Sequence, residues 1–316
     1  MRRLILAIAA AGAFALVATT ATAQQFINVL TGGTSGIYYP IGVALSNIYG
    51  PVLPEFKISV QATKASVENL NLLQTGRGEV ALTLGDALSQ AWAGNEEAGF
   101  KQPLTKLRGI SAMYSNYIQI VARADAGIKS LKDLKGKRIS VGAAKSGTEL
   151  NARAVLAAAG IQYKDFSKVE YLPYAESVEL LKNRQIDVTL QSAGLGNPAL
   201  RDLASSVDIV FVPVPADVIK KIGDKAYLSA TIPADTYKGQ SAAVPTTSIV
   251  NFLVTHEGVS ADTVYKMTKA MFENLDKLVA AHAAAKGVKL ENAASAMPIP
   301  LHPGAEKYYR EKGLIK

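Results

Sequence analysis

The stretch "LTGGTSGIYYP" at residues 30–40 follows the short apolar run "FINVL" (26–30), which is typical of a buried strand. A second stretch, "GAAKSGTELNA" at residues 142–152, again follows a strand-like run. In both stretches Gly, Ser and Thr stand where a helix is expected to begin. The chain therefore contains the same kind of polar strand-to-helix turn twice, far apart in the sequence.

Strand and helix patterns alternate around each turn. Before residue 90, strand patterns at 56–63 and 79–86 alternate with helical patterns at 38–50 and 65–78. This order predicts right-handed crossovers and a parallel sheet. The alternation restarts near residue 138, and helices at 260–285 and 303–312 close the chain. The polar segment 229–239 is interpreted as a surface loop.

Two long β-rich runs without a helix break, 107–125 and 246–255, separate these units. They predict a two-lobed α/β protein in which one domain interrupts the other. Lobe 1 is expected at 24–112 plus 250–316, and lobe 2 at 113–249. Two crossings make a hinge, so we expect a ligand cleft between the lobes at the carboxyl ends of the strands.

The first 23 residues have the form of a cleavable signal peptide. Arg2 and Arg3 precede an apolar run, and Ala21-Thr22-Ala23 resembles a signal-peptidase site. An uncleaved N-terminal anchor is the alternative. Removal of the two arginines changes the formal charge from +8 to +6, and the chain has no cysteine. We therefore expect a periplasmic protein without disulfides or thiol chemistry, and without the dense basic and aromatic surface of a nucleic-acid-binding protein.

The two turns are candidates for binding an anion. The first backbone N–H groups of a helix lack partners and carry the positive end of its dipole. Glycine lets a ligand approach the backbone, and Ser or Thr hydroxyls add donors. The alternative is that these residues only cap helices and fill tight turns. The candidate ligand-binding residues of the turns are Gly33, Thr34, Ser35, Tyr38, Ser146, Gly147 and Thr148.

Further candidates follow predicted strands. Asp86 ends "VALTLGD", Gln191 and Ser192 end "DVTLQS", and Asn197 lies at the next helix start. Asp86 has two possible roles, as a helix cap or as an acceptor for a ligand. If Asp86 or Glu149 faces the cleft as an anion, a ligand with an ammonium group is favoured. If both are turned away as caps, a plain dicarboxylate is favoured.

The sequence argues against several other functions. It has no P-loop and no dinucleotide fingerprint around "GGTSG". The three histidines, His256, His282 and His302, match neither G-x-S-x-G nor H-E-x-x-H chemistry. A metal site formed by Asp86, Glu149 and a histidine has no support from spacing. We therefore expect no enzymatic activity, no cofactor and no resident metal. No coiled-coil pattern is present, so a monomer is expected.

Several motifs together resemble the TAXI family, the extracytoplasmic solute-binding proteins of tripartite ATP-independent periplasmic (TRAP) transporters. They are "TGGTSGIYYPIG", "LGDALSQAW", "GAAKSGTELNARAVL", "AGLGNPA" and "PIPLHPGAEKYYREKG". The resemblance implies a type II periplasmic-binding-protein fold and places the two turns near the ligand. The family commonly has Gly where this chain has Ser35. Unlike another branch of TRAP binding proteins, the chain has no evident cleft arginine to clamp a carboxylate.

The resemblance implies capture of a small organic anion by lobe closure and its delivery to TRAP membrane subunits. Glutamate-like amino acids and C4 or C5 dicarboxylates are the expected solutes. The alternative function is a ligand sensor that presents its closed form to a membrane kinase. Neighbouring genes would distinguish these functions, because one requires a TRAP membrane gene and the other a kinase gene.

Overall fold

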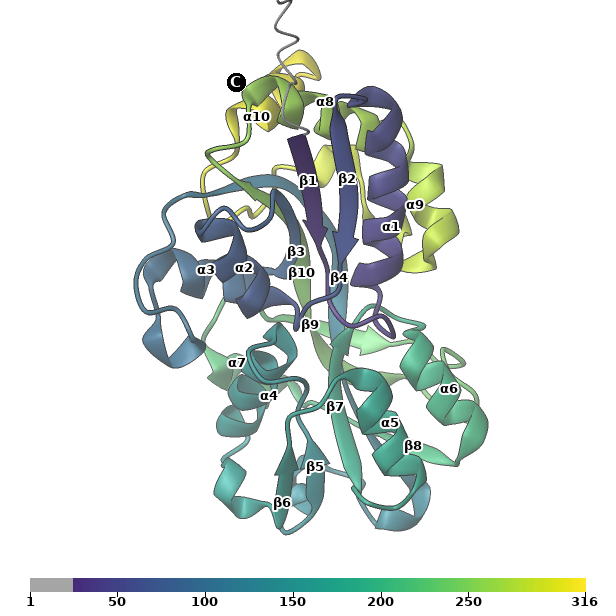
Figure 1. Ribbon diagram of the computed structural model, residues 1–316. Coiled ribbons are helices and arrows are strands. Elements are labelled where there is room, and N and C mark those ends of the chain that lie inside the picture. The colour runs from purple at the N-terminus through teal and green to yellow at the C-terminus, as the bar shows by residue number, and fades with distance from the viewer. Residues whose placement is uncertain (1–24) are drawn as a thin grey trace, which may run out of the picture.

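The computed structural model describes residues 25–316 and consists of two lobes joined by two long strands (Figure 1). The predicted signal peptide, residues 1–23, lies outside the described residues. One lobe contains the first strands and the C-terminal helices, and the other contains the middle of the chain. The two-lobed α/β fold predicted from the sequence is thereby confirmed.

Lobe 1 contains three parallel strands in the order β2–β1–β3. The buried strand β3 carries no exposed residue, whereas the edge strand β2 alternates between half-buried and exposed positions. The strands are β1 (Gln25–Leu30), β2 (Phe56–Gln61) and β3 (Val80–Leu84). The helices that follow them are α1 (Tyr38–Tyr49), α2 (Ser66–Gln74) and α3 (Gly85–Ala93).

The C-terminal helices complete lobe 1. They are α8 (Ala261–Phe272), α9 (Leu275–Ala281) and α10 (Pro303–Glu311). Tyr308 and Tyr309 of α10 are buried, and the ring of Tyr308 stacks on that of Phe272 at 6.0 Å. These aromatic contacts fix the end of the chain on the lobe that contains its beginning.

Lobe 2 repeats the pattern with three parallel strands, in the order β7–β5–β6. They are β5 (Arg138–Ser140), β6 (Lys168–Glu170) and β7 (Val188–Ala193). The helices are α4 (Gly147–Ala158), α5 (Tyr174–Lys182), α6 (Pro198–Ser206) and α7 (Ala216–Ile222). Two further strands are antiparallel to the crossing strands, β8 (Ile209–Val212) to β4 and β9 (Leu228–Ile232) to β10.

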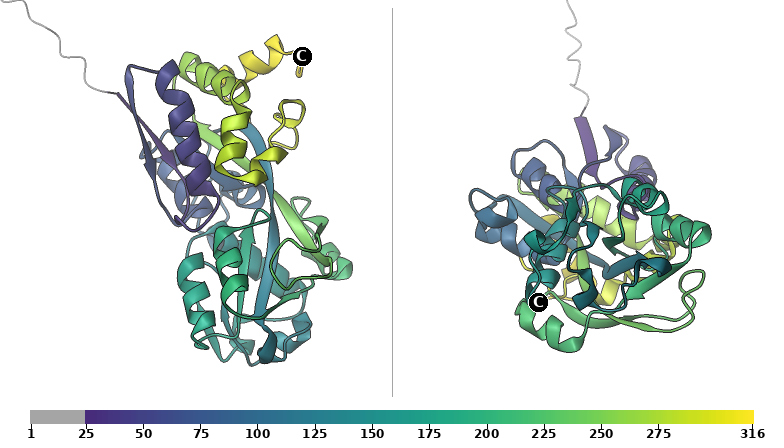
Figure 2. Two further views of the ribbon diagram at one scale, coloured as in Figure 1. Left: turned by 90° about the vertical axis from the view of Figure 1, so that its right-hand side faces the viewer. Right: turned by 90° about the horizontal axis from the view of Figure 1, so that it is seen from below.

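The crossing strands β4 (Leu107–Arg123) and β10 (Val244–His256) pair antiparallel and run from one lobe into the other (Figure 2). They join both lobes into one sheet path, β2-β1-β3-β10-β4-β7-β5-β6. Their pairing shifts between Val250 and Phe252. The lobe boundaries that we propose, 112/113 and 249/250, fall beside this irregularity, where a bend is least costly to the sheet.

The prediction of a surface loop at 229–239 is wrong at its start. Residues 228–232 form β9, which is held by backbone pairing with β10. Most of β9 is exposed, so its sequence shows little apolar pattern. The loop beyond it carries Tyr237, which is buried and donates a hydrogen bond to Gln119 Oε1 at 2.6 Å. None of the helices in residues 25–316 is long and apolar enough to cross a membrane.

Candidate functional site

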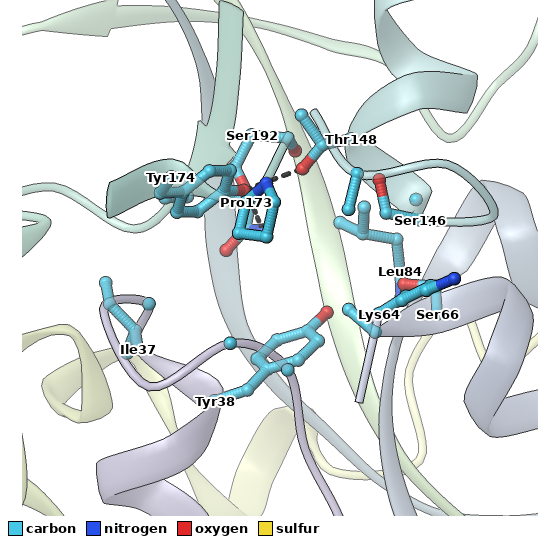
Figure 3. A pocket seen from close by; sticks show the side chains of 18 of the residues that line it. Ile37, Tyr38, Lys64, Ser66, Leu84, Ser146, Thr148, Pro173, Tyr174 and Ser192 are labelled. Carbon is cyan, nitrogen blue, oxygen red and sulfur yellow. Dashed lines mark hydrogen bonds between the residues drawn. The ribbon is translucent and has the colours of Figure 1, made fainter. Parts of the chain in front are cut away.

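A cavity of about 100 Å³ lies between the lobes, where both expected turns meet (Figure 3). One buried water needs roughly 10–15 Å³ on the same measure, so the cavity has room for a solute of several heavy atoms. Lobe 1 contributes the turn after β1, and lobe 2 contributes the turn after β5. Tyr114 and Asn116 of β4 and Ser192 of β7 line it from the central sheet.

Four helices begin at the wall of this cavity, two from each lobe. Their first residues, which all line it, are Tyr38, Ser66, Gly147 and Tyr174. Each helix start brings unpaired N–H groups and a partial positive charge. Within residues 25–316, Lys64 has the only charged side chain that lines the cavity. The cavity is therefore electrostatically suited to an anion, although neither turn forms a salt-bridge clamp.

The first turn is anchored by buried hydrogen bonds beneath it. Thr31 Oγ1 donates to the Gln61 carbonyl at 2.7 Å, and Asn69 Nδ2 donates to the Thr31 carbonyl at 2.7 Å. The Gly36 N–H closes the turn on the Gly33 carbonyl at 3.0 Å. These bonds hold the backbone between β1 and α1 in one position, so the turn is preformed for a ligand.

The second turn is capped by Ser146. Its Oγ accepts a hydrogen bond from the Glu149 N–H at 3.1 Å, so its own hydroxyl proton is free to be donated elsewhere. Lys145, just before it, has φ of +63°, a conformation that non-glycine residues rarely adopt. Ala65, before α2, likewise has φ of +69°. Such strained positions are concentrated at functional sites, and here Ala65 itself lines the cavity.

A chain of hydrogen bonds fixes the polar side chains that belong to the central sheet. The Tyr38 hydroxyl donates to Asn251 Oδ1. Asn251 Nδ2 donates to Asn116 Oδ1 at 2.8 Å, and Asn116 Nδ2 donates to the Ser192 carbonyl at 2.7 Å. Burial raises the pKa of Tyr38 well above its usual value, so this phenol stays neutral. This series of hydrogen bonds fixes the orientation of the side-chain amides of Asn251 and Asn116.

On the side of lobe 2, Tyr174 closes the cavity. Its hydroxyl donates to the Ser192 carbonyl at 2.6 Å and lies 2.6 Å from Thr148 Oγ1 (Figure 3). Burial raises the pKa of Tyr174 to about 12, partly offset by these two hydrogen bonds. Tyr174 is therefore a neutral hydrogen-bonding group at physiological pH.

Two hydroxyl groups at the cavity have no hydrogen-bond partner among residues 25–316. They are the Tyr114 hydroxyl and Ser192 Oγ, on residues that are only 2% and 3% exposed. An unpaired buried hydroxyl costs about 1–3 kcal/mol, so such groups normally face a ligand or a water. Together with the four helix starts, they give the cavity donors for more than one oxygen atom of a solute.

The lobes touch around the cavity, so the structure is a closed form. Ser35 Oγ of lobe 1 accepts a hydrogen bond from the Ala175 N–H of lobe 2 at 3.2 Å. Arg153 Nη1 of lobe 2 donates to the Glu97 carbonyl of lobe 1 at 2.8 Å. A solute in the cavity would therefore lie between the two lobes and contact both of them.

The structure brings most of the candidate residues together. The candidates that line the cavity are Gly33, Ser35, Tyr38, Ser146, Gly147, Thr148 and Ser192. Thr34 is exposed outside it. Gln191 lies on the opposite face of β7 from Ser192, because successive strand residues alternate. There Gln191 accepts a hydrogen bond from Asn197 Nδ2 at 3.1 Å, and Asn197 caps α6.

Asp86 and Glu149, whose orientation distinguishes a ligand with an ammonium group from a plain dicarboxylate, both point away from the cavity. Asp86 is fully buried and accepts hydrogen bonds from Asn151 and Tyr227. Glu149 forms an ion pair with Arg153 at 2.7 Å and accepts a hydrogen bond from Tyr163 at 2.8 Å. Neither carboxyl group lines the cavity.

The lining residues that the sequence analysis missed include Ser66, Tyr174, Tyr114 and Asn116. Ser66 and Tyr174 begin helices after β2 and β6, so the argument used for the two polar turns applies to them as well. Tyr114 and Asn116 alternate along β4 on one face of the sheet. No local signal shows which face of a crossing strand meets the cleft.

The histidines have structural contacts outside the cavity. His302 caps α10 by accepting a hydrogen bond from the Gly304 N–H at 3.2 Å. His282, expected within a helix, instead follows α9 and accepts from the Ala284 N–H at 3.1 Å. Burial lowers the pKa of both. Residues 25–316 contain no group of three or more His, Cys, Asp or Glu side chains placed to hold a metal ion.

Known structures share this fold at low identity. PhnD1 from Prochlorococcus marinus, solved with methylphosphonate, is 13% identical with a TM-score of 0.61 over 93% of this chain and 100% of that chain. The periplasmic binding protein BugD is 13% identical with a TM-score of 0.58, over 92% and 95%. A protein from Bordetella bronchiseptica RB50 is 15% identical with a TM-score of 0.57, over 91% and 98%.

At these identities the similarity shows the fold alone, which is that of periplasmic binding proteins. A sequence comparison gives the family. The pattern of the NMT1-like family matches residues 29–313, a span that contains both lobes and every residue that lines the cavity. The chain therefore belongs to the NMT1-like family.

Proposed function

We propose that this protein is a periplasmic solute-binding protein that captures a small organic oxyanion by closure of its two lobes and releases it unchanged to a transporter. The observation that carries the proposal is the meeting of four helix starts at one cavity between the lobes, with no acid among the described residues that line it. Within residues 25–316, no His, Asp or Glu lines the cavity as a general base, which supports binding rather than turnover.

The charge of the cavity favours an anion held by neutral groups. A helix terminus stabilises a nearby charge by about 0.3–1 kcal/mol, and by up to about 2 kcal/mol when partly buried. Hydrogen bonds to a charged group contribute about 1.5–3 kcal/mol each. Four helix starts and the hydroxyls of Tyr114 and Ser192 are sufficient on this scale for micromolar binding, which requires about −8 kcal/mol.

The cavity disfavours a solute with an ammonium group. An ammonium needs an anionic or carbonyl partner when it is removed from water. Asp86 is hydrogen-bonded to Asn151, and Glu149 is paired with Arg153, both outside the cavity. In the described residues, the charged side chain at the cavity wall is the cation Lys64. We therefore propose a C4 or C5 dicarboxylate as the solute, rather than a glutamate-like amino acid.

The identity of the transporter is a narrower part of the proposal. PhnD1 holds methylphosphonate, an oxyanion, in the same fold, which supports an anionic solute here. The TAXI-like motifs at 31–42 and 142–156 support TRAP membrane subunits as the partner. The signal-peptide pattern of residues 1–23 supports export, and the lack of a coiled-coil pattern supports a monomer.

A thermal-shift and calorimetry panel tests the solute class. The purified protein is compared with succinate, 2-oxoglutarate, L-glutamate, methylphosphonate and methanesulfonate. We expect a dicarboxylate to raise the melting temperature, because a hundredfold excess over Kd adds about 2.7 kcal/mol. Binding of L-glutamate alone contradicts the argument against ammonium groups. Binding of methylphosphonate or methanesulfonate alone contradicts the carboxylate assignment but not the anion site.

Matched variants locate the binding. Ser192→Ala removes a hydroxyl at the cavity, whereas Thr189→Val removes a buried unpartnered hydroxyl on the same strand outside it. We expect only Ser192→Ala to weaken the binding of the solute. Equal effects of the two substitutions contradict the assignment of the cavity.

Uptake of the solute by proteoliposomes that contain TRAP membrane subunits tests the proposed partner. Binding of the loaded form to a kinase ectodomain without uptake supports the sensor instead.

A further inference from the structure

A buried carboxyl group bridges the two lobes outside the cavity. Asp86, in the first turn of α3, belongs to lobe 1 and has no exposed surface. Its Oδ2 accepts hydrogen bonds from Asn151 Nδ2 at 2.6 Å and from the Tyr227 hydroxyl at 2.8 Å. Asn151 lies in α4 and Tyr227 precedes β9, so both donors belong to lobe 2. The contact exists only while the lobes are closed.

This contact contains two unsatisfied acceptors. Asp86 Oδ1 and Asn151 Oδ1 are both buried and lack a hydrogen-bond partner. An ionised carboxylate offers acceptors only, so it leaves the amide oxygen unpaired. A protonated carboxyl group has one O–H, which the unpaired amide oxygen can accept while the amide N–H bond to Oδ2 remains. One proton on Asp86 therefore satisfies both oxygens of the pair.

The surroundings of Asp86 also favour its neutral form. Burial raises its pKa to about 6, and the negative charge of Asp224 adds to this, while the Tyr227 hydroxyl and the N–H groups at the start of α3 oppose it. The other titratable groups that act on this site are Tyr227 and Tyr38, and burial raises the pKa of both well above the usual value, so both stay neutral. Within residues 25–316, no salt bridge pairs Asp86 with a lysine, arginine or histidine, and no cation is among the main causes of its pKa shift.

We propose that Asp86 and Asn151 form a proton-binding site between the lobes, which fills when the lobes close. Near pH 5, solute capture is then accompanied by the uptake of close to one proton, and this second statement rests on the proposed function. In an open form Asp86 regains water and the ordinary carboxyl pKa of about 3.9. A group with a raised pKa favours the closed form at low pH, and this advantage is lost as the pH rises through about 6. Closure is expected to be about tenfold more favourable at pH 5 than at pH 7.5.

A disulfide-locked protein tests the site without any solute, so its result is independent of the proposed function. Ser35 Oγ lies 3.2 Å from the Ala175 backbone nitrogen across the lobes, and Ser35→Cys with Ala175→Cys places two thiols in a chain that has no other cysteine. Carbon-13 NMR of the Asp86 carboxyl group, assigned with Asp86→Asn, gives its titration midpoint. We expect a midpoint near 6 in the oxidised protein and a lower one after reduction. A midpoint below 4.5 in the oxidised protein overturns the proposal.

A second measurement does not require the disulfide to hold the protein in the closed form. Asparagine at position 86 mimics the protonated acid, because its amide N–H can be donated to Asn151 Oδ1. Oxidation rates of the paired cysteines are compared with and without Asp86→Asn at the same pH, so thiol ionisation cancels. We expect the acceleration by Asp86→Asn to be about tenfold larger at pH 7.5 than at pH 5. Equal acceleration at both pH values, or none, contradicts the proton site. Asp224→Asn provides a second comparison, because it removes a nearby charge that raises the pKa of Asp86 and should lower its titration midpoint without mimicking the protonated pair.

Discussion

Gly147 of lobe 2 lies so close to Ser66 of lobe 1 that a methyl group on Gly147 would come within 2.6 Å of the Ser66 hydroxyl oxygen. The same methyl group would lie 2.6 Å from a methyl carbon of Leu84, again in lobe 1. All three residues line the cavity. The first residues of α2 and α4 therefore meet only because position 147 has no side chain, and this contact exists only in the closed form.

Gly147→Ala is expected to block full closure while leaving each lobe folded. The position begins a helix, where alanine is well tolerated, and the obstructing atoms belong to the other lobe. We expect the Kd of the solute to rise at least tenfold, with a change of less than 1 kcal/mol in the free energy of unfolding. Small-angle X-ray scattering with saturating solute measures closure, and calorimetry measures Kd.

Gly33→Ala is the matched control, because a methyl group there would meet no atom within 4 Å although Gly33 also lines the cavity. It is expected to bind solute within about threefold of the parent protein. Tight binding and full compaction of Gly147→Ala would show that α2 and α4 separate further in solution than this structure indicates.

Tyr114→Phe is expected to weaken solute binding about tenfold without lowering stability. The Tyr114 hydroxyl is buried at the cavity without a partner, so the protein loses no internal hydrogen bond when it is removed. A hydrogen bond to a charged ligand contributes about 1.5–3 kcal/mol, and tenfold corresponds to about 1.4 kcal/mol. Calorimetry measures the affinity and urea unfolding the stability.

Tyr49→Phe provides the comparison for this substitution. The Tyr49 hydroxyl is likewise buried and unpartnered, but it lies in the core of lobe 1 and does not line the cavity. Its removal should leave the affinity unchanged. If Tyr114→Phe also leaves the affinity unchanged, Tyr114 does not contact the solute.

Ser35→Gly restores the residue that the TAXI-like turn commonly has and is expected to speed solute release. Ser35 Oγ makes the hydrogen bond to the Ala175 N–H that joins the lobes at 3.2 Å. Loss of this hydrogen bond destabilises the closed form by about 0.5–1.5 kcal/mol, which corresponds to a two- to tenfold faster dissociation of the solute. Stopped-flow displacement measures this rate, and Thr34→Gly is the control because Thr34 lies beside it, exposed and outside the cavity. An unchanged rate for Ser35→Gly means that the contact does not contribute to retention.

The fold was predictable because each lobe carries its pattern locally. The runs 26–30 and 79–86 are apolar enough to predict buried strands, and β1 and β3 occupy them. The uninterrupted β-rich run 107–125 predicted a crossing, and β4 occupies residues 107–123 of it. Such patterns follow from burial and periodicity within one segment, which a single sequence shows directly.

The site was less predictable because it depends on where segments meet. Gly147 and Ser192 were found from their positions after strands, but Gln191, one residue before Ser192, points to the opposite face of β7. The sequence placed Asp86 at the end of a strand, but it lies in the first turn of α3, and its partners Asn151 and Tyr227 come from the other lobe. Contacts between lobes leave no local periodicity, so no sequence pattern predicted them.

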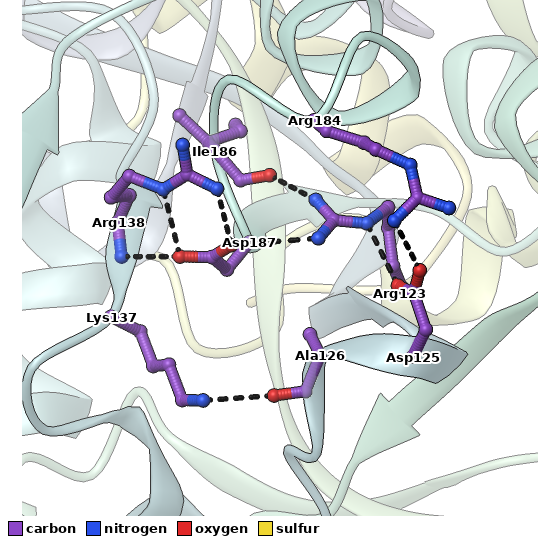
Figure 4. A network of polar contacts seen from close by, with 8 residues as sticks. All are labelled: Arg123, Asp125, Ala126, Lys137, Arg138, Arg184, Ile186 and Asp187. Carbon is purple, nitrogen blue, oxygen red and sulfur yellow. Dashed lines mark hydrogen bonds and ion pairs between the residues drawn. The ribbon is translucent and has the colours of Figure 1, made fainter.

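Asp187→Asn is expected to destabilise lobe 2 in a pH-dependent way. The Asp187 carboxylate accepts hydrogen bonds from the Arg138 N–H and from its Nε and Nη2 at 2.7–3.0 Å, and it lies 3.6 Å from Arg123 Nη2 (Figure 4). These contacts, chiefly the hydrogen bonds from Arg138, lower its pKa to about 2. The network ties β4, β5 and the start of β7 together.

A carboxyl group with a depressed pKa stabilises the fold above its unfolded pKa of about 3.9, and this contribution is lost as the pH falls towards about 2. Because the Asp187 side chain is 15% exposed, we expect about 2 kcal/mol less stability for Asp187→Asn at pH 7, and about half that difference at pH 3. Urea unfolding at both pH values measures it. Asp125→Asn alters the same network at a carboxylate that is 47% exposed, so its effect should be smaller because solvent screens the charge. A deficit of Asp187→Asn that is equal at pH 7 and pH 3 would show that lost packing, rather than the charged pair, accounts for it.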